Sequence, residues 1–218
     1  MVIDPASVGQ YPDGRDAPCV QNAKRSPDVA EGKSDTLYRT FALFVLFVAG
    51  CYFIMALGNT TTPHLCDSGY SSAEAAKIHA LCCGSVALCR ALGGRVCDKL
   101  GLRRAAVLFS VLLPTLPLGL LAAGKLIFAP ALVILGFGMA NSATAVYTPL
   151  LTAELFGQEN YSRTYSKINA LGYLFGAVTP IIYGKIYTFW GSYCLSYYLF
   201  TAIFLVGVVS LLTIEAKR

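Results

Sequence analysis

The sequence predicts an all-α membrane protein with six transmembrane helices. Of its 218 residues, 56% are hydrophobic and only 13% are charged, whereas soluble domains average about 25% charged residues. The mean hydropathy is +0.59. Charged residues are crowded into short stretches, and the runs between them approach the roughly 20 apolar residues that a bilayer-crossing helix needs. These observations argue against a soluble enzyme.

The chain divides into a tail, a membrane bundle and a second, very short tail. Residues 1–37 are polar and rich in Pro, Asp and Gly, which predicts a disordered cytoplasmic tail or a linker between bundles. Residues 38–214 form the predicted six-helix bundle, and residues 215–218 form a cytoplasmic tail. The predicted spans are, in order, 41–57, 73–94, 105–124, 126–150, 168–187 and 194–214.

The first two spans differ in polarity. The first, 41–57, is uncharged, and a polar loop over 58–72 follows it. The second, 73–94, contains two basic residues, an acidic residue and a histidine. It is therefore the least certain span by hydropathy, and a charged loop over 95–104 ends it.

Proline shapes the next two spans. Pro114 and Pro117 are expected to bend the third, because proline removes backbone hydrogen bonds. Gly124 and Lys125 form a very short predicted turn. Pro130 falls in the first turn of the fourth span, where proline is tolerated.

The last two spans are separated by aromatic residues. A polar loop over 154–167 precedes the fifth span. An aromatic-rich turn over 188–193 follows it, as expected at a membrane interface. The sixth span ends at the charged tail.

Basic residues follow the positive-inside pattern. With the N-terminus in the cytoplasm, six spans place the C-terminus there too, and outside turns hold only Lys125 and Lys185. This asymmetry predicts a multi-pass protein of the cell (cytoplasmic) membrane with both termini inside. The thirteen inside residues are Arg15, Lys24, Arg25, Lys33, Arg39, Arg95, Lys99, Arg103, Arg104, Arg163, Lys167, Lys217 and Arg218.

No cofactor, metal or nucleic acid is expected. The net charge of +5 is explained by membrane orientation rather than by nucleic-acid binding. Most of the eight Cys residues lie in apolar runs, and no CxxC spacing occurs, which argues against a metal or redox centre. A Walker-type phosphate loop and a catalytic constellation are also missing from the sequence, so we expect no enzyme.

Arg90 is the first candidate site residue. It lies eight residues before Asp98, hence roughly 12 Å inside a hydrocarbon layer about 30 Å thick. A guanidinium there is costly unless it meets water or a partner, and it does not deprotonate. An anion anchor in a substrate cavity is the functional interpretation; snorkelling or a bond to a backbone carbonyl is the structural one.

His79 is a second, weaker candidate. It lies eleven residues before Arg90, close to the outer interface. A histidine titrates in the physiological range, so His79 could serve a proton-coupled step.

The loop after the second span carries the most specific pattern, Gly94 followed by Asp98-Lys99, Gly101 and Arg103. Glycine at a helix end allows close helix approach, and Asp98 could cap a helix N-terminus. Gly101 could take a positive φ in the turn. An ordinary basic loop explains the charges but not this spacing.

This spacing resembles the signature loop of the major facilitator superfamily, Gly-x-x-x-Asp-(Arg/Lys)-x-Gly-(Arg/Lys)-(Arg/Lys). Leu102 stands where that family usually has a basic residue. With Arg90 upstream, the wider run is similar to the region between the eighth and ninth helices of the oxalate/formate antiporter and monocarboxylate carrier group. The last two spans resemble that group's eleventh and twelfth helices. The resemblance implies one six-helix half-bundle of a major facilitator fold, the C-terminal half.

The resemblance also implies site residues. In that group an arginine of the eighth helix binds the substrate carboxylate, and Arg90 stands at the matching position. The oxalate carrier uses a lysine midway along its eleventh helix, where this chain has Asn169 and Tyr173 but no charge. A monocarboxylate is therefore expected more than oxalate.

Other polar residues inside the spans could line a cavity. Asn141, Asn169 and Tyr173 are the candidates, although polar residues between membrane helices more often hold helices together. The spacing Gly172-x-x-x-Gly176 is typical of close helix packing.

The predicted function is secondary active transport of a small carboxylate by alternating access, with a small organic anion and membrane lipid as partners. Such carriers need two six-helix bundles, so we also expect a missing N-terminal half or a second copy. The alternatives are a truncated, non-transporting membrane subunit and a carrier of the same class for a sugar or drug.

Overall fold

Every regular element in residues 31–215, which are the residues that the computed structural model describes, is helical. The chain separates into the units Met1–Leu37 and Tyr38–Arg218. Most of the predicted tail lies outside the described residues; its last part, from Glu31, belongs to α1. The elements are α1 (Glu31–Leu57), η2 (Gly58–Thr60), α2 (Thr61–Asp67), α3 (Ser72–Leu100), α4 (Leu102–Leu112), α5 (Thr115–Leu121), α6 (Ala129–Ser142), η3 (Ala143–Tyr147), α7 (Thr148–Phe156), α8 (Tyr161–Trp190) and α9 (Cys194–Glu215).

Five segments of the described chain are long and apolar enough to cross a membrane. The predicted fifth span falls in α8, which has 30 residues but is not among the five. The expectation that the second span is weakest by hydropathy is therefore wrong, because α3 qualifies and α8 does not. The five segments are Leu37–Asp67, Ser72–Leu100, Arg104–Leu121, Ala129–Phe156 and Cys194–Thr213.

The predicted polar loop over 58–72 is mostly helical. η2 and α2 continue α1, and both Thr60 and His64 are buried. The Thr60 hydroxyl donates to the Leu57 carbonyl over 2.7 Å, and the His64 ring lies 2.7 Å from the carbonyl oxygen of Leu120. These contacts satisfy polar groups that the sequence pattern alone places in a loop.

Pro114 interrupts the third predicted span, as expected. α4 ends at Leu112 and α5 begins at Thr115, because proline cannot donate the backbone hydrogen bond that would continue the helix. Pro130 lies in the first turn of α6, which confirms its expected place. The turn around Gly124 is longer than predicted, since residues 122–128 connect the two helices.

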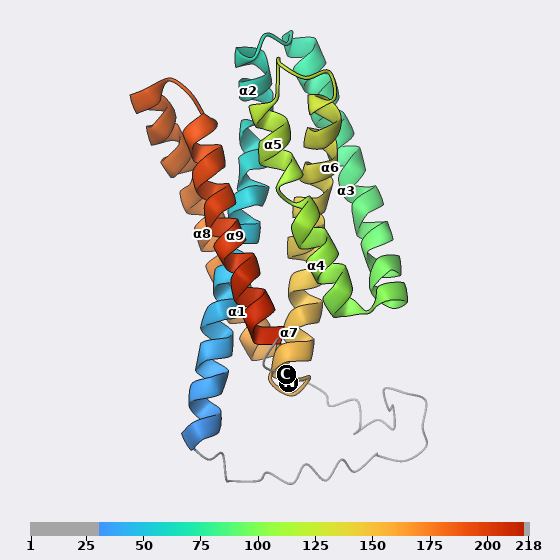
Figure 1. The fold of residues 1–218 in the computed structure, drawn as a ribbon, viewed down its shortest axis with the longest axis vertical. Coiled ribbons are helices and arrows are strands. Elements are labelled where there is room, and N and C mark those ends of the chain that lie inside the picture. The colour runs from blue at the N-terminus through green and yellow to red at the C-terminus, as the bar shows by residue number, and fades with distance from the viewer. Residues whose placement is uncertain (1–30, 216–218) are drawn as a thin grey trace, which may run out of the picture. The chain divides into compact units, whose positions relative to one another are not determined.

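Helices α5 and α6 pack almost backbone to backbone. A Cβ at Gly119 would lie 2.7 Å from the Val133 backbone nitrogen, and one at Gly136 would lie 2.5 Å from the Leu116 Cα. Figure 1 shows α3, α5 and α6 side by side, in agreement with their contacts. Glycine on both faces is what allows this approach.

The fourth segment contains a π-helical turn between α6 and α7. The backbone N–H of Thr148 donates to the Ala143 carbonyl, five residues earlier, and the Thr148 hydroxyl donates to the same carbonyl over 3.1 Å. Such turns occur often at functional sites. After α7, the predicted polar loop over 154–167 is reduced to residues 157–160, since α8 already begins at Tyr161.

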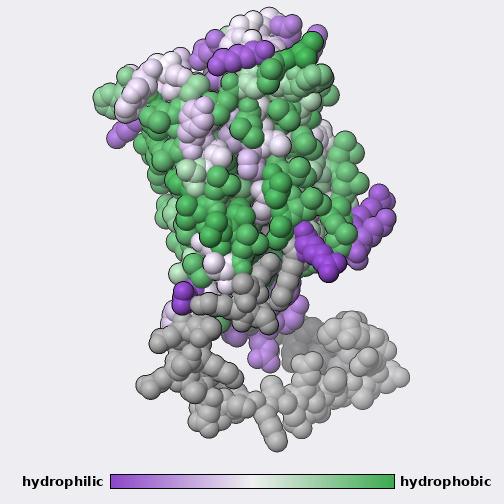
Figure 2. Space-filling model, viewed as in Figure 1, coloured by the Kyte–Doolittle hydropathy of each residue, from purple (hydrophilic) through white to green (hydrophobic). Residues whose placement is uncertain are grey.

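Apolar side chains fill the interior and also cover the outside. Phe44 and Phe47 of α1 are buried together with Phe200 and Phe204 of α9. Figure 2 shows hydrophobic residues over the middle of the visible face and hydrophilic residues towards its two ends. Water would disfavour such an exposed apolar band, whereas hydrocarbon accommodates it.

Candidate functional site

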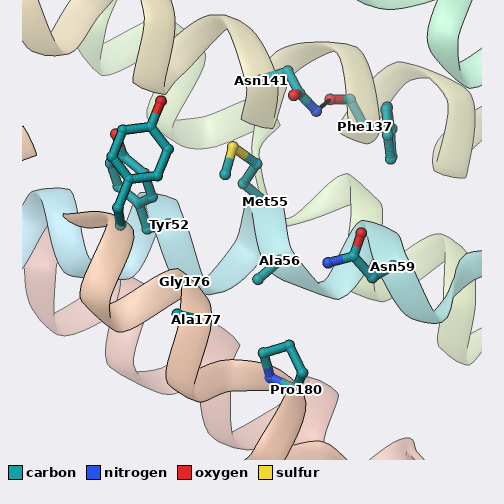
Figure 3. Close-up of a pocket in the computed structure, with 10 residues that line it drawn as sticks. Tyr52, Met55, Ala56, Asn59, Phe137, Asn141, Gly176, Ala177 and Pro180 are labelled. Carbon is teal, nitrogen blue, oxygen red and sulfur yellow. Dashed lines mark hydrogen bonds between the residues drawn. The ribbon is translucent and has the colours of Figure 1, made fainter. Parts of the chain in front are cut away.

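A cavity of about 440 Å³ lies between α1 with η2, α6 and α8. Figure 3 shows side chains from these helices converging on it. None of the residues that line it carries a charge at neutral pH. They are Tyr52, Met55, Ala56, Asn59, Phe137, Asn141, Tyr173, Gly176, Ala177 and Pro180.

Three of the four predicted binding residues lie at or beside this cavity. Asn141 and Tyr173 line it. Asn169, one turn before Tyr173 on α8, accepts a 2.7 Å hydrogen bond from the Tyr52 hydroxyl. The Tyr52 and Tyr173 rings meet edge to face, with centroids 5.3 Å apart.

Tyr52 is the residue of this group that the sequence interpretation missed. Its side chain is buried, and its ring occupies the space that a side chain at Gly172 would fill. A Cβ at Gly176 would only touch the ring, at 3.6 Å. The Gly172-x-x-x-Gly176 spacing therefore does serve close packing, but against an aromatic ring of α1 rather than a helix backbone.

Two amides give the cavity its polar character. The Asn141 side-chain nitrogen donates to the Phe137 carbonyl over 3.0 Å, and the amide oxygen is turned away from that carbonyl (Figure 3). Asn59, from η2, is exposed and extends its amide towards the same space. The ring of Phe137 packs against Gly58 and occupies the space that a Cβ at this position would need.

Arg90 lies on α3, is exposed, and does not line the cavity. The register of α3 on α6 fixes its depth. The Ser85 hydroxyl donates to the Ile134 carbonyl over 2.8 Å, and a Cβ at Gly138 would lie 2.7 Å from the Cys89 sulfur. The two helices therefore run parallel, and Arg90 is level with the turn of α6 that follows Gly138.

The same contact fixes the side of α3 on which Arg90 lies. Successive helix residues are about 100° apart. Consider two neighbouring helices that run parallel and touch at one residue of each. The residue that follows the contact residue on one helix, and the residue that precedes the contact residue on the other helix, project from the same side of the helix pair. Arg90 follows Cys89, and Phe137 precedes Gly138. Arg90 is thus on the side of α3 where Phe137 lines the cavity.

His79 lies on the same face of α3, because eleven residues make slightly more than three complete turns. Its ring meets Phe137 edge to face, with centroids 5.7 Å apart. Its Nδ1 atom is buried and has no hydrogen-bond partner among the described residues. It lies about 16 Å along α3 from Arg90.

The predicted signature loop is mostly helix. α3 continues to Leu100, so Asp98 and Lys99 lie in its last turn. The expectation that Asp98 caps a helix is wrong, because the residue at the N-cap of α4 is Gly101 and no side chain caps it. Gly101 has a φ of 82°, as expected for a turn that favours glycine.

The sequence pattern predicts that Gly94 allows a close approach to another helix, but the close approach occurs at Gly93. A Cβ at Gly94 would meet nothing within 4 Å, whereas one at Gly93 would lie 3.1 Å from the Tyr147 hydroxyl oxygen. Arg103 lies in the first turn of α4, and its side chain is outside the described part of the structure.

No group of three or more His, Cys, Asp or Glu side chains that could hold a metal ion occurs within the described residues.

Comparison with protein families matches residues 67–218 to the Major Facilitator Superfamily. The chain belongs to this superfamily. The match covers more than half of the sequence and includes α3, the α3–α4 turn and every later helix. A comparison with curated proteins gave no match.

Membership of the superfamily decides the class of the protein. Its members are transporters and not enzymes, so the chain is a multi-pass membrane protein with a major facilitator fold. α8, which is not among the five apolar segments, contributes Tyr173, Gly176, Ala177 and Pro180 to the cavity lining.

Proposed function

We propose that this protein is a secondary active transporter, or the C-terminal half of one, that moves a small carboxylate by alternating access. Arg90 is the anion anchor in this proposal. The supporting observation is its place on the cavity side of α3, level with Asn141 of α6. Asn141, Asn169 and Tyr173 bind the rest of the substrate.

The physical reason is the cost of a charge inside a membrane. Arg90 lies well within the span of α3, and its guanidinium does not lose its proton. A charge at this depth is costly unless it faces water or a counter-ion. A water-filled substrate pathway and an incoming carboxylate supply both.

A monocarboxylate fits better than oxalate. The ten residues that line the cavity supply no second cation. Lys167 lies near the first residues of α8, and Lys185 lies near its last turn, so neither supports a second carboxylate in the middle of the span.

The proposed partner is a second six-helix bundle, which is either an N-terminal half or a second copy of this chain. Alternating access requires one bundle to rock against another around a central site. Exposed apolar side chains on α8 offer a surface for that bundle. They include Leu174, Val178 and Ile181.

The α3–α4 turn and His79 have roles in the same cycle. We assign gating to Gly94, Asp98, Lys99, Gly101 and Arg103, because a short turn restrains the two helices that it joins. His79 carries the coupled proton, supported by its unpartnered Nδ1. The excess of basic residues in the predicted inside segments supports an orientation with both termini in the cytoplasm, and the cell membrane is the proposed location.

A transport assay tests the proposal. The full chain, reconstituted in liposomes, is expected to take up labelled formate or lactate more than oxalate, and a neutral sugar not at all. Uptake of the sugar or of an uncharged drug instead would replace the carboxylate proposal. Correct insertion without uptake of any compound would support a non-transporting subunit.

A further inference from the structure

The cavity between α1, α6 and α8 has a chemistry of its own, which the arginine does not explain. Its lining is uncharged, and it combines aromatic and aliphatic walls with two side-chain amides. Arg90 stands on a neighbouring helix and is not part of this lining. A substrate carboxylate and the remainder of the substrate would therefore meet different surroundings.

The orientation of Asn141 determines what the cavity can bind. The Phe137 carbonyl can only accept a hydrogen bond, so the group of Asn141 that faces it is the NH₂. Because this nitrogen is hydrogen-bonded to the carbonyl, the amide oxygen is the group of Asn141 that a ligand in the cavity can reach (Figure 3). It has no partner among the described residues, and a ligand that donates a hydrogen bond would satisfy it.

A second carboxylate would be disfavoured at the same place. Its oxygens only accept hydrogen bonds, so none of them could pair with the Asn141 oxygen. No cation lines the cavity to offset the loss of hydration, and an unpaired charge removed from water is costly. Met55 and Phe137 instead offer apolar contact to a short carbon chain.

We propose that this cavity is a subsite for a neutral hydroxyl group at the end of the substrate remote from its carboxylate. Asn141 accepts the hydroxyl hydrogen, and Asn59 supplies a second polar contact. The preferred substrates are then ω-hydroxy monocarboxylates, with unsubstituted acids bound more weakly and dicarboxylates most weakly. This assignment rests on the proposed role of Arg90 as the carboxylate anchor.

Four-carbon acids provide a matched series. Axes of packed helices are about 8–10 Å apart, a gap that the arginine side chain and a four-carbon chain can bridge together. 4-Hydroxybutanoate, butanoate and succinate differ only at the end remote from the first carboxylate. Their dissociation constants can be obtained from ligand-dependent thermal stabilisation of the purified full chain.

We expect 4-hydroxybutanoate to bind about tenfold more tightly than butanoate, and succinate to bind more weakly than both. Asn141→Ala should abolish the advantage of the hydroxyl, so that 4-hydroxybutanoate and butanoate bind with equal affinity. Asn59→Ala, at an exposed position, should reduce that advantage and provides the test if Asn141→Ala does not fold. Asn160→Ala is the control, because Asn160 is exposed at the start of α8 and makes no capping bond.

The outcomes separate the two proposals. Binding of butanoate that depends on Arg90, with equal or weaker binding of 4-hydroxybutanoate, would overturn the hydroxyl subsite alone. An advantage of the hydroxyl that survives in both asparagine variants would also overturn it. If none of the three acids stabilises the protein, the result would contradict the carboxylate-carrier proposal, and with it the hydroxyl subsite that depends on that proposal.

Discussion

Arg90→Ala is expected to reduce carboxylate uptake roughly 30-fold or more. Removing one partner of a desolvated charge pair typically costs about 2–5 kcal/mol, and none of the residues that line the cavity supplies a cation. Arg90→Lys should retain part of the activity, because lysine keeps the charge but lacks the planar fork that binds a carboxylate through two hydrogen bonds. Uptake into proteoliposomes at several substrate concentrations measures the change.

Arg163→Ala is the matched control for this prediction. Arg163 is exposed in the first turn of α8, so its removal changes the net charge equally and should leave uptake close to that of the original chain. Equal uptake by the Arg90→Ala protein and the original chain would show that the guanidinium does not bind the substrate.

Gly136→Ala is expected to have the largest effect on folding. A methyl group there would collide with the backbone of Leu116 on α5, which cannot move aside as the end of a flexible side chain can. Overpacking of this kind costs about 1–3 kcal/mol. The loss should appear as a lower midpoint in unfolding from mixed micelles and as less monodisperse protein after heating.

Gly84→Ala distinguishes the collision from the loss of a glycine as such. A Cβ at Gly84 would meet nothing within 4 Å, and alanine favours a helix more than glycine does. This variant should be as stable as the original chain or slightly more stable. If both glycine variants had the same stability, the close α5–α6 crossing would not describe the folded protein.

The helical class was predictable because it depends on composition and on the length of apolar runs. The break at Pro114 and the positive φ of Gly101 also follow from the residues alone. Helix ends were predicted less well. η2 and α2 were interpreted as a loop because residues such as Thr60 and His64 are polar, and only the folded chain shows which backbone groups they bond.

The candidate site was predictable in its polar residues but not in its geometry. Asn141, Asn169 and Tyr173 stand out as polar residues in apolar spans. Tyr52 carries a similar signal, since its hydroxyl lies inside an apolar run and needs a partner, but the sequence does not identify Asn169 as that partner. The π-helical turn could not be predicted, because it depends on which carbonyl each backbone N–H bonds, as the Thr148 N–H bonds the Ala143 carbonyl.

The central claim is that the Arg90 face of α3 borders a water-filled space. Cys83 allows a direct test, because it is exposed and lies seven residues, or about two turns, from Arg90 on the same face. The other seven of the eight cysteines are replaced by serine or alanine. Reaction rates are then measured with anionic sulfonatoethyl and cationic trimethylammonium-ethyl methanethiosulfonate.

The anionic reagent is expected to react at least threefold faster than the cationic one, since a positive charge about 10 Å away attracts it in a medium of reduced dielectric. Arg90→Gln should remove that preference, and a transported carboxylate should slow the reaction. A Cys83 that reacts only with a lipid-soluble maleimide, and with neither charged reagent, would place this face against lipid and contradict the carrier mechanism.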